Sequence, residues 1–278
     1  MLHFMTNGIR PSCPTLLIDR GSRFTAAMMA LPDADVSQWP TFTFPPDEHP
    51  LVSIKKSLDE AKLPAPAQTL ICDMHGACAS AETNVSERRA RRILRWKDSL
   101  HRTEGRPELF LQEELEGWEA QALLLDARRT FGSALGTDSG LAALLAALSM
   151  DALRDRSWRE GVTVIWAGYS HIQAFMIYQE KLLGLYEQHS GISKDALLKD
   201  LEQLRLNWLP DEQVRAAGGH GCLCGDFPAE AEGFRPTWIL GPRRSALEGC
   251  GRLISPCGDD KFDRCFGLLF GITLRKAA

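Results

Sequence analysis

Two stretches of the chain share one pattern of hydrophobic and polar positions. Each is a short apolar run, a turn around a glycine, and a second mostly apolar run, which is typical of a β-hairpin. The first turn is at Gly21 and the second at Gly168, so the repeat distance is 147 residues. Because that is about half of the 278-residue chain, the pattern predicts two related domains, which we place at residues 1–157 and 158–278.

The remaining periodicity predicts strands and helices that alternate along the chain. Further strands are expected at 69–73, 122–126, 181–187 and 237–240. Helices are expected at 51–62, 84–100 and 138–151. A further helix should begin after Ser193 as its N-cap, and another should run from Pro210 to the glycines at 218–219. Residues 266–274 fit either element, and the proline-rich segment 31–50 predicts an extended loop or an edge strand. This alternation indicates the α/β or the α+β class.

The first glycine turn carries a carboxylate and a hydroxyl next to backbone N–H groups. Asp19 precedes the turn, and Gly21 and Ser22 form it. A carboxylate at this place can hold a metal-bound water, while the N–H groups and the hydroxyl suit a phosphate. A plain hairpin with a polar turn explains the same residues. At the position that matches Asp19 in the second copy stands Trp166, which cannot ligate a metal.

Three further clusters in the second half combine glycine with polar side chains. They are Gly168 with Ser170 and His171, Gly219 with His220, and Gly241 with Arg243 and Arg244. Glycine lets the backbone approach a ligand closely, and paired arginines suit phosphate or carboxylate. Each cluster also has an ordinary explanation, namely a strand histidine, a helix C-cap with its loop, and surface arginines.

Eight cysteines raise the question of a metal site. Cys222 and Cys224 form a C-x-C pair beside His220, and together with Cys257 they offer ligands for zinc or an iron–sulfur cluster. Isolated, reduced and buried thiols are the alternative that we favour. The chain has no C-x-x-x-C-x-x-C run, so it lacks the cluster ligands of a radical S-adenosylmethionine enzyme.

Composition and charge narrow the class of partner. Hydrophobic residues make up 44% and charged residues 24% of the chain, which is enough for a folded core. The net charge of −4 argues against a general nucleic-acid binder, which usually carries a basic surface. The longest apolar run, at 141–150, is shorter than the ~20 residues of a membrane span. With no signal peptide visible, we expect a cytoplasmic protein without a nucleic-acid or membrane partner.

Taken in order, the motifs of the second half resemble a known prokaryotic family. They lie at 162–174, 184–191, 218–221, 241–244, 255–260 and 265–269. This family is a domain of unknown function that carries the label pyruvate formate-lyase activating enzyme. It is grouped with the actin-like ATPases, sugar kinases and Hsp70. This resemblance implies a ribonuclease-H-like fold of two related lobes, with ATP and Mg²⁺ in a central cleft. One glycine hairpin from each lobe would hold the phosphates.

The resemblance also implies roles for residues of this chain. Asp19 would position Mg²⁺ through water, with Gly21 and Ser22 in the first phosphate loop. The second loop would contain Gly168, Ser170 and His171, and further nucleotide contacts would come from Gly219, His220, Gly241, Arg243, Arg244 and Asp259. This chain differs from the family pattern at two further positions. Trp166 stands where a polar residue is expected, and Cys257 stands where a histidine is expected. These departures weigh against metal-dependent hydrolysis and leave the implied fold intact.

Three functions remain open on the sequence. The first is a nucleotide-binding protein that hydrolyses ATP slowly, transfers its phosphate, or acts as an activator-type switch in anaerobic metabolism. The second is a degenerate, non-catalytic protein that recognises a small ligand or a partner enzyme, which the loss of polarity at Trp166 favours. The third is a cysteine-ligated metal or iron–sulfur activator.

Overall fold

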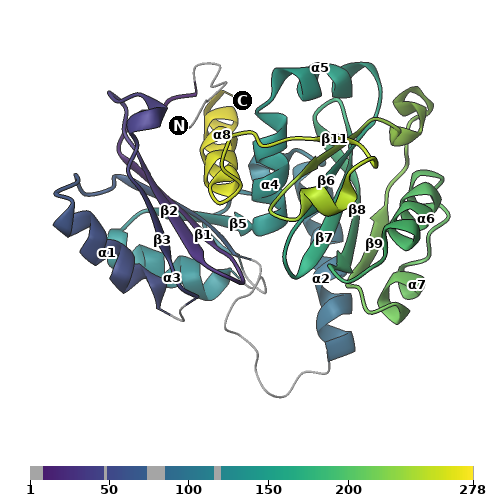
Figure 1. The fold of residues 1–278 in the computed structure, drawn as a ribbon, viewed down its shortest axis with the longest axis horizontal. Helices are drawn as coiled ribbons and strands as arrows, with labels where there is room; N and C mark the ends of the chain where they lie inside the picture. Colours follow the sequence, from purple (N-terminus) through teal and green to yellow (C-terminus); the bar gives the residue numbers. More distant parts are fainter. Residues whose placement is uncertain (1–8, 47–48, 74–84, 116–119, 278) are drawn as a thin grey trace. The chain divides into compact units, whose positions relative to one another are not determined.

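The structure, a computed structural model, describes residues 9–46, 49–73, 85–115 and 120–277. The chain divides into two compact units, and each unit contains one mixed β-sheet. The first unit comprises 1–79, 108–146 and 256–278, and the second unit comprises 80–107 and 147–255. Figure 1 shows the elements of each unit with their labels.

The first unit is built on a five-stranded sheet with the order β3-β2-β1-β4-β5. Its strands are β1 (Thr15–Arg20), β2 (Thr25–Ala30), β3 (Thr41–Phe44), β4 (Gln68–Asp73) and β5 (Ala134–Asp138). β1, β4 and β5 run parallel, whereas β2 and β3 are antiparallel to their neighbours. Its helices are α1 (Pro50–Glu60), α3 (Gln121–Phe131), most of α4 (Ser139–Leu148) and α8 (Asp263–Ala277), with 3₁₀ turns η1 (Val36–Gln38) and η2 (Pro107–Phe110) along the chain.

Alternation along β1 sends successive side chains to opposite faces of the first sheet. Leu16 and Ile18 belong to a buried cluster that α1 and α3 complete, with Ile54 and Leu123 among its members. On the other face, Asp19 lies against α8, which packs on β1 and β4. Helices therefore cover both faces of this sheet, as Figure 1 shows, and every residue of β1 is buried.

The second unit contains a six-stranded sheet with the order β11-β10-β6-β7-β8-β9. Its strands are β6 (Val162–Ala167), β7 (His171–Tyr178), β8 (Lys181–His189), β9 (Gly221–Cys224), β10 (Thr237–Leu240) and β11 (Arg252–Leu253). Its helices are α2 (Val85–Thr103), α5 (Asp151–Arg159), α6 (Lys194–Arg205) and α7 (Asp211–Ala216), with 3₁₀ turns η3 (Ala229–Phe234) and η4 (Arg244–Leu247).

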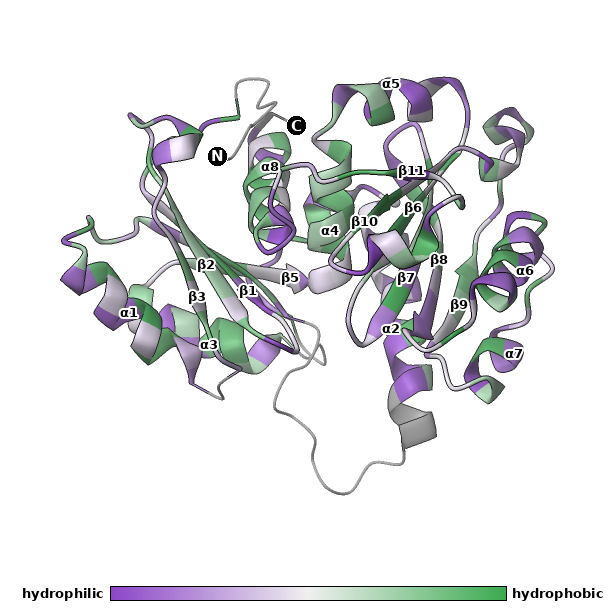
Figure 2. Ribbon diagram, in the orientation of Figure 1, coloured by the Kyte–Doolittle hydropathy of each residue, from purple (hydrophilic) through white to green (hydrophobic). Residues whose placement is uncertain are grey.

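Helices also cover both faces of the second sheet. On one face, Leu201 of α6 and Val214 of α7 join Ile165 of β6 in a buried cluster. On the other face, Trp96 of α2 packs at a tilt on Phe175 of β7, with ring centroids 6.3 Å apart. Figure 2 shows hydrophobic residues concentrated in the central strands of this sheet and hydrophilic residues on α5. This sandwich holds the ends of β6, β7 and β8 in fixed positions.

The two sheets repeat one strand order and one hairpin register. The order β3-β2-β1-β4-β5 recurs in the second sheet as β8-β7-β6-β10-β11. The pairing of Arg20 with Thr25 across the first hairpin recurs 147 residues later across the second. In both turns the glycine N–H donates to the carbonyl three residues later, at 3.0 Å for Gly21 and 2.9 Å for Gly168. The internal repeat predicted from the sequence is therefore confirmed.

One predicted element is wrong, and a second has different bounds. The segment 122–126, expected as a strand, lies inside α3, where Leu123, Leu124 and Ala127 form the buried side. Their spacing fits a helix, and the strand of this region is β5, which the sequence prediction missed. The helix predicted at 138–151 is confirmed over 139–148, which form α4, but Asp138 ends β5 and Asp151 begins α5.

Other predicted elements are confirmed. The proline-rich segment 31–50 contributes the edge strand β3, and residues 266–274 lie in the helix α8. Ser193 caps α6, because its hydroxyl oxygen accepts the N–H of Ala196 at 3.2 Å. The sequence division at 157/158 separates the strands of the two sheets, but α2 belongs to the second compact unit and α8 to the first. Within the described ranges, none of the helices has both the length and the apolar character needed to cross a membrane.

Candidate functional site

Three carboxylates stand at the carboxyl edge of the parallel strands in the first unit. Asp19 is the next-to-last residue of β1, while Asp73 and Asp138 end β4 and β5 in direct register. Because parallel strands end at the same edge of a sheet, the three acids gather there. Two of them have partners close by: Asp73 pairs with Arg20, and Asp138 accepts the N–H of Gly140 at 2.8 Å.

Asp19 is held in a buried ion pair. It is only 1% exposed, and its Oδ2 lies 2.9 Å from Nε of Arg264, a residue of α8. Cys72 donates a longer contact from Sγ to Oδ1 at 3.4 Å. Burial raises the pKa of Asp19, and the charge of Arg264 opposes part of that increase. A carboxylate engaged in this way is closed to water, so Arg264 would have to withdraw before a metal-bound water could reach it.

The tip of the first hairpin lies over the same arginine. A Cβ atom at Gly21 would stand 3.1 Å from Nη2 of Arg264 and equally close to the carbonyl of Phe24. Glycine therefore gives the turn room to approach the guanidinium. Ser22, the next residue of the turn, is exposed, so its hydroxyl and N–H are the groups that a ligand would meet first.

In the second unit, a tryptophan fills the position that matches Asp19. Trp166 is 3% exposed and lies against two glycines. A Cβ atom at Gly168 would stand 2.8 Å from its Nε1, and one at Gly241 would stand 2.9 Å from its Cε3. Gly241 also has a φ of +104°, which other residues rarely adopt. The indole thus makes a close packing contact where the first unit has a charge.

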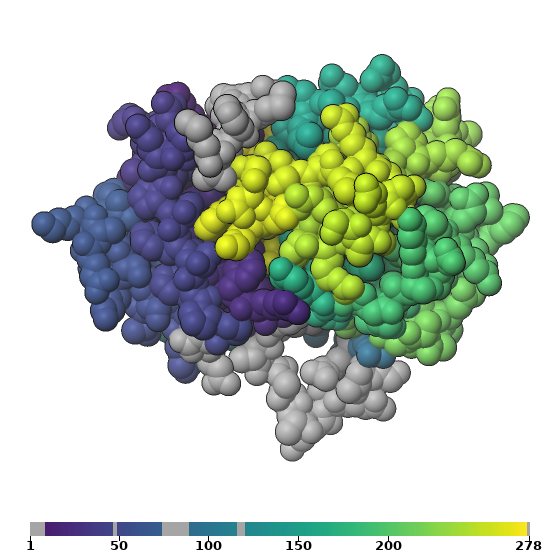
Figure 3. All heavy atoms as spheres, viewed as in Figure 1, coloured from purple at the N-terminus to yellow at the C-terminus, as the bar shows by residue number. Residues whose placement is uncertain are grey.

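A small pocket opens beside the second hairpin tip, within the second unit. Its cavity volume is about 50 Å³, and its lining includes Gly168, Ser190, Lys194, Arg243 and Leu247. The segment that follows β10 supplies part of this lining, and Figure 3 shows yellow-green atoms of that part of the chain on the surface. The pocket therefore combines a glycine turn with two cations.

The two cations of this pocket contact neutral groups. Nη1 of Arg243 donates to the carbonyl of Ser190 at 2.8 Å, and Nζ of Lys194 donates to the carbonyl of Glu248 at 2.6 Å. In the described part of the chain, neither cation forms an ion pair with a carboxylate. Lys194 is also the first residue of α6, whose N-terminal end adds partial positive charge. The pocket is therefore suited to an anion.

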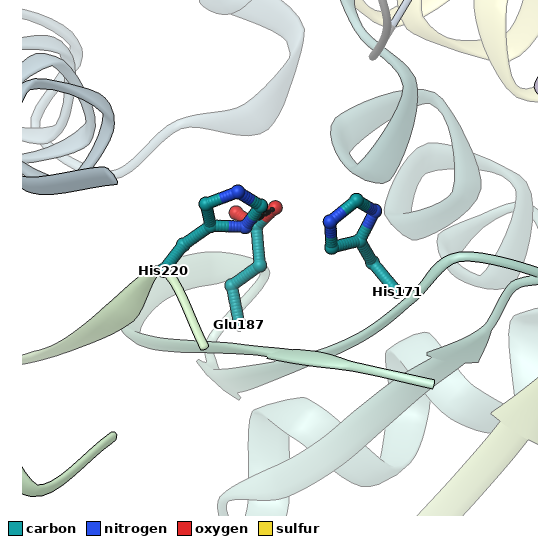
Figure 4. A group of neighbouring side chains, drawn as sticks. All are labelled: His171, Glu187 and His220. Carbon is teal, nitrogen blue, oxygen red and sulfur yellow. Dashed lines mark ion pairs between the residues drawn. The ribbon is translucent and has the colours of Figure 1, made fainter. Parts of the chain in front are cut away.

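A second group joins His171, Glu187 and His220, from β7, β8 and the loop before β9 (Figure 4). We call it the histidine–glutamate cluster. Oε1 of Glu187 lies 2.8 Å from Nδ1 of His220, and the two imidazole rings have centroids 4.6 Å apart. In Figure 4 the ring of His171 turns toward the other two side chains. The three side chains therefore converge on one point.

Arg92 of α2 fixes the carboxylate of this cluster. Glu187 is 0% exposed, and Nε of Arg92 lies 2.7 Å from its Oε2 and 3.0 Å from its Oε1. Burial disfavours the charged form of Glu187, but Arg92, followed by His220 and His171, outweighs burial and holds the pKa of Glu187 well below its usual range. The carboxylate is therefore an anion at neutral pH.

A glycine-rich helix end places His220 beside Glu187. Gly218 and Gly219 donate their N–H groups to carbonyls of the last turn of α7, both at 3.0 Å, and Gly218 has a φ of +89°. This is a Schellman motif, so the C-cap predicted for these glycines is present. The N–H of His220 then donates to the carbonyl of Glu187 at 3.0 Å.

The comparisons with known proteins identify the family. A family model matches residues 48–246, and its description is "Putative pyruvate format-lyase activating enzyme (DUF1786)". The chain belongs to this family. The match covers more than two thirds of the chain, and it includes the histidine–glutamate cluster and Arg243 of the pocket. No curated protein matches the chain.

Solved structures align with this family member over nearly its whole length. The Lmo2764 protein of Listeria monocytogenes, a putative N-acetylmannosamine kinase, has a TM-score of 0.50 and 10% identity, over 95% of this chain and 99% of that chain. A Bacteroides thetaiotaomicron protein with actin-like ATPase fold and unknown function has a TM-score of 0.46 and 11% identity, over 97% of this chain and 98% of that chain. Component A of the Acidaminococcus fermentans (R)-2-hydroxyglutaryl-CoA dehydratase has a TM-score of 0.46 and 11% identity, over 96% of this chain and 100% of that chain. The family member has the actin-like ATPase fold.

The structure brings some of the predicted site residues of this family member together. Gly168 and Arg243 line the pocket, whereas His171 and His220 meet in the histidine–glutamate cluster. Ser170 is tied to that cluster, because its hydroxyl lies 3.1 Å from Nδ1 of His171. The second hairpin therefore contributes to two sites.

Other predicted residues have local partners. Nη1 of Arg244 donates to the carbonyl of Gly241 at 3.3 Å, which steadies the turn after β10. The carboxylate of Asp259 accepts the N–H of Lys261 at 3.0 Å and so closes the loop before α8. The sequence also predicts a turn at 74–76, after the strand at 69–73, and those residues lie outside the described ones.

Of the cysteines proposed as metal ligands, Cys222 and Cys224 interact through their side chains, whereas Cys257 belongs to the other compact unit. The thiols of Cys222, Cys224 and Cys257 each contact a backbone carbonyl, that of Leu209, Leu204 and Asp259 respectively. Burial raises the pKa of Cys257, which disfavours the thiolate that a metal needs. In the described ranges, no group of three metal-ligating side chains contains a cysteine.

Sequence reasoning missed four charged residues at these sites. They are Arg92, Glu187, Lys194 and Arg264. A local signal existed for Arg92, because it lies four residues before Trp96 and so shares the inward face of α2. Arg264 gave no such signal, since its partner Asp19 is near the other end of the chain.

Proposed function

We propose that this protein binds a nucleotide such as ATP, with a phosphate group in the pocket beside the second hairpin. The observation that carries the proposal is the pairing of the Gly168 turn with Lys194 and Arg243 around one cavity. The glycine lets the backbone of the turn approach a ligand closely, and the two cations contact only neutral carbonyls. The actin-like ATPase fold and the family membership are consistent with this proposal.

The size of the pocket limits what it holds. Pockets for drug-sized ligands usually measure about 300–1,000 Å³. A cavity of about 50 Å³ is suited to one phosphate group, so the rest of the nucleotide would extend beyond it. Lys194 and Arg243 would then offset phosphate charge, which is the main task of protein side chains in phosphoryl chemistry.

We propose slow hydrolysis, or use of the nucleotide as a switch, rather than fast turnover. Asp19 is the candidate that would position Mg²⁺ through a water molecule. Its pairing with Arg264 supports slow turnover, because the ion pair must open before that water can be held. Transfer of the phosphate to an acceptor remains part of this proposal.

A second candidate function is a non-catalytic ligand-binding or partner-binding protein. The observation that favours it is Trp166, whose indole packs between Gly168 and Gly241 where a polar group is expected. Such a protein would retain the anion pocket and lose hydrolysis. A partner enzyme or a small phosphorylated ligand would be its target.

Calorimetric titration with Mg-ATP and with a non-hydrolysable ATP analogue tests binding. We expect Arg243→Ala and Lys194→Ala each to weaken binding by about tenfold, or about 1.4 kcal/mol. The matched control is Lys199→Ala, which removes an exposed cation from the same helix and should bind as the native protein does. Native protein that binds no nucleotide, or variants that bind as the control does, would refute the pocket.

Phosphate release separates the two candidate functions. If Asp19 positions the attacking water, Asp19→Asn abolishes release while nucleotide binding persists. An unchanged rate would remove that role from Asp19. Binding without release in the native protein would instead favour the non-catalytic candidate.

A further inference from the structure

The histidine–glutamate cluster offers the donor atoms of a transition-metal site. Two imidazole nitrogens and one carboxylate oxygen are a set of protein ligands that zinc commonly uses. The fourth coordination position of the ion then stays open for water or another ligand. In this chain the three donor atoms all lie within 4.8 Å of one another. His171 and Glu187 belong to the adjacent strands β7 and β8, so the sheet itself sets their separation.

The distances leave room for an ion after a small adjustment. Two ligand atoms on a tetrahedral ion with bonds of ~2.1 Å stand about 3.4 Å apart. Nδ1 of His220 lies 2.8 Å from Oε1 of Glu187, so the pair would separate by about half an ångström. His220 has a side chain that is 21% exposed, which gives it freedom to rotate. Its Nδ1 is buried, and the contact of Nδ1 with Glu187 is close but not aligned as a hydrogen bond.

Neighbouring groups orient the ligands in the way that metal sites require. The hydroxyl of Ser170 contacts Nδ1 of His171 at 3.1 Å, which leaves Nε2 as the metal-facing nitrogen. Arg92 holds the carboxylate of Glu187 through its Nε. A carboxylate has about four acceptor sites, so this contact leaves a lone pair for an ion.

We propose that His171, Glu187 and His220 bind a zinc ion. None of the three lines the phosphate pocket, so the metal site is separate from it. The site does not rest on the proposed function, because zinc can bind whether or not the protein takes up a nucleotide. With three protein ligands, the ion keeps an open position that suits an oxygen ligand of a substrate or partner.

Zinc titration of chelator-treated, full-length protein without nucleotide tests the proposal. We expect one ion per chain, and about 100-fold weaker binding in His171→Ala and in His220→Ala, because each loses one of three ligands. His189→Ala is the matched control. Its ring contacts the carbonyl of Ala217 and the N–H of Gly191 and lies outside the cluster, so it should bind zinc within twofold of the native protein.

Cobalt absorption identifies the donor atoms independently. Co²⁺ in this site should show visible bands of a four- or five-coordinate ion without the near-ultraviolet charge-transfer band of a thiolate ligand. Three results would overturn the proposal: no tight zinc binding by the native protein, undiminished binding by both cluster variants, or a thiolate band. Circular dichroism of each variant establishes that a loss of binding is not a loss of fold.

Discussion

The buried pair of Asp19 and Arg264 makes the sharpest stability prediction. The carboxylate is 1% exposed and the guanidinium side chain 11% exposed, and Oδ2 lies 2.9 Å from Nε. Removing one partner of a buried pair leaves an uncompensated charge and typically costs about 3–5 kcal/mol. We therefore expect Arg264→Met to destabilise the protein by about that amount. Replacing both partners at once, with Asp19→Asn and Arg264→Met, should cost less than the sum of the two single changes.

Urea denaturation of the two single variants and the double variant measures the coupling. We expect a coupling free energy of at least about 2 kcal/mol, within the range seen for residues in contact. The control is the exposed pair of Lys56 and Glu60 on α1, with side chains 76% and 68% exposed. Its removal by Lys56→Met should cost less than about 0.5 kcal/mol. A coupling free energy at the buried pair that is below about 0.5 kcal/mol would refute the reasoning.

The pH dependence of Arg264→Met follows from the direction of the pKa shift. Burial raises the pKa of Asp19, and Arg264 is the main group that opposes this. Without Arg264 the folded protein holds the proton of Asp19 more tightly than the unfolded chain does. Stability is then retained at low pH and is lost as the pH rises above the unfolded value of about 3.9. The deficit of the variant relative to the native protein should therefore grow between pH 4 and pH 7.

Three further predictions concern the second unit. Gly221→Ala should destabilise the protein by at least about 1 kcal/mol more than Gly233→Ala, measured by urea denaturation. Both glycines have a positive φ, but a Cβ at Gly221 would meet Oδ1 of Asp211 at 2.0 Å, whereas a Cβ at Gly233 would have no atom within 4 Å. Ser193→Ala should cost about 1 kcal/mol and speed amide exchange in the first turn of α6, because it removes the N-cap. Zinc at 100 times its Kd should stabilise the protein by about 2.7 kcal/mol in the same assay, and a chelator should reverse this.

The hairpins could be predicted because their signals are local. An apolar run, a glycine and a second apolar run are adjacent in sequence, and the turn at Gly21 is closed by one hydrogen bond within four residues. The error at 122–126 has a physical reason as well. Ala122 to Leu125 is a short apolar run, and such runs do not distinguish a strand from a helix that is buried on one side.

The site could be predicted only where its residues stand in glycine turns. Gly168, His171 and His220 carried such signals, but their partners did not. Arg92 meets Glu187 across 95 positions of sequence, and no periodic pattern relates residues so far apart. Fully buried charges are rare and follow from three-dimensional pairing, so a sequence reading assigns an arginine or a glutamate to the surface by default.

The two hairpins share a register and differ in chemistry, so the proposed function assigns binding and hydrolysis to different residues. In the first unit, the acid position holds Asp19, whose charge is engaged by Arg264. In the second unit, the matching position is Trp166, and the cations of the pocket come from elements outside the hairpin. The cations of the pocket therefore do not depend on an acid at position 166. A change at Arg243 should then alter nucleotide affinity, a change at Asp19 should alter turnover, and equal effects of both changes on affinity would contradict this separation.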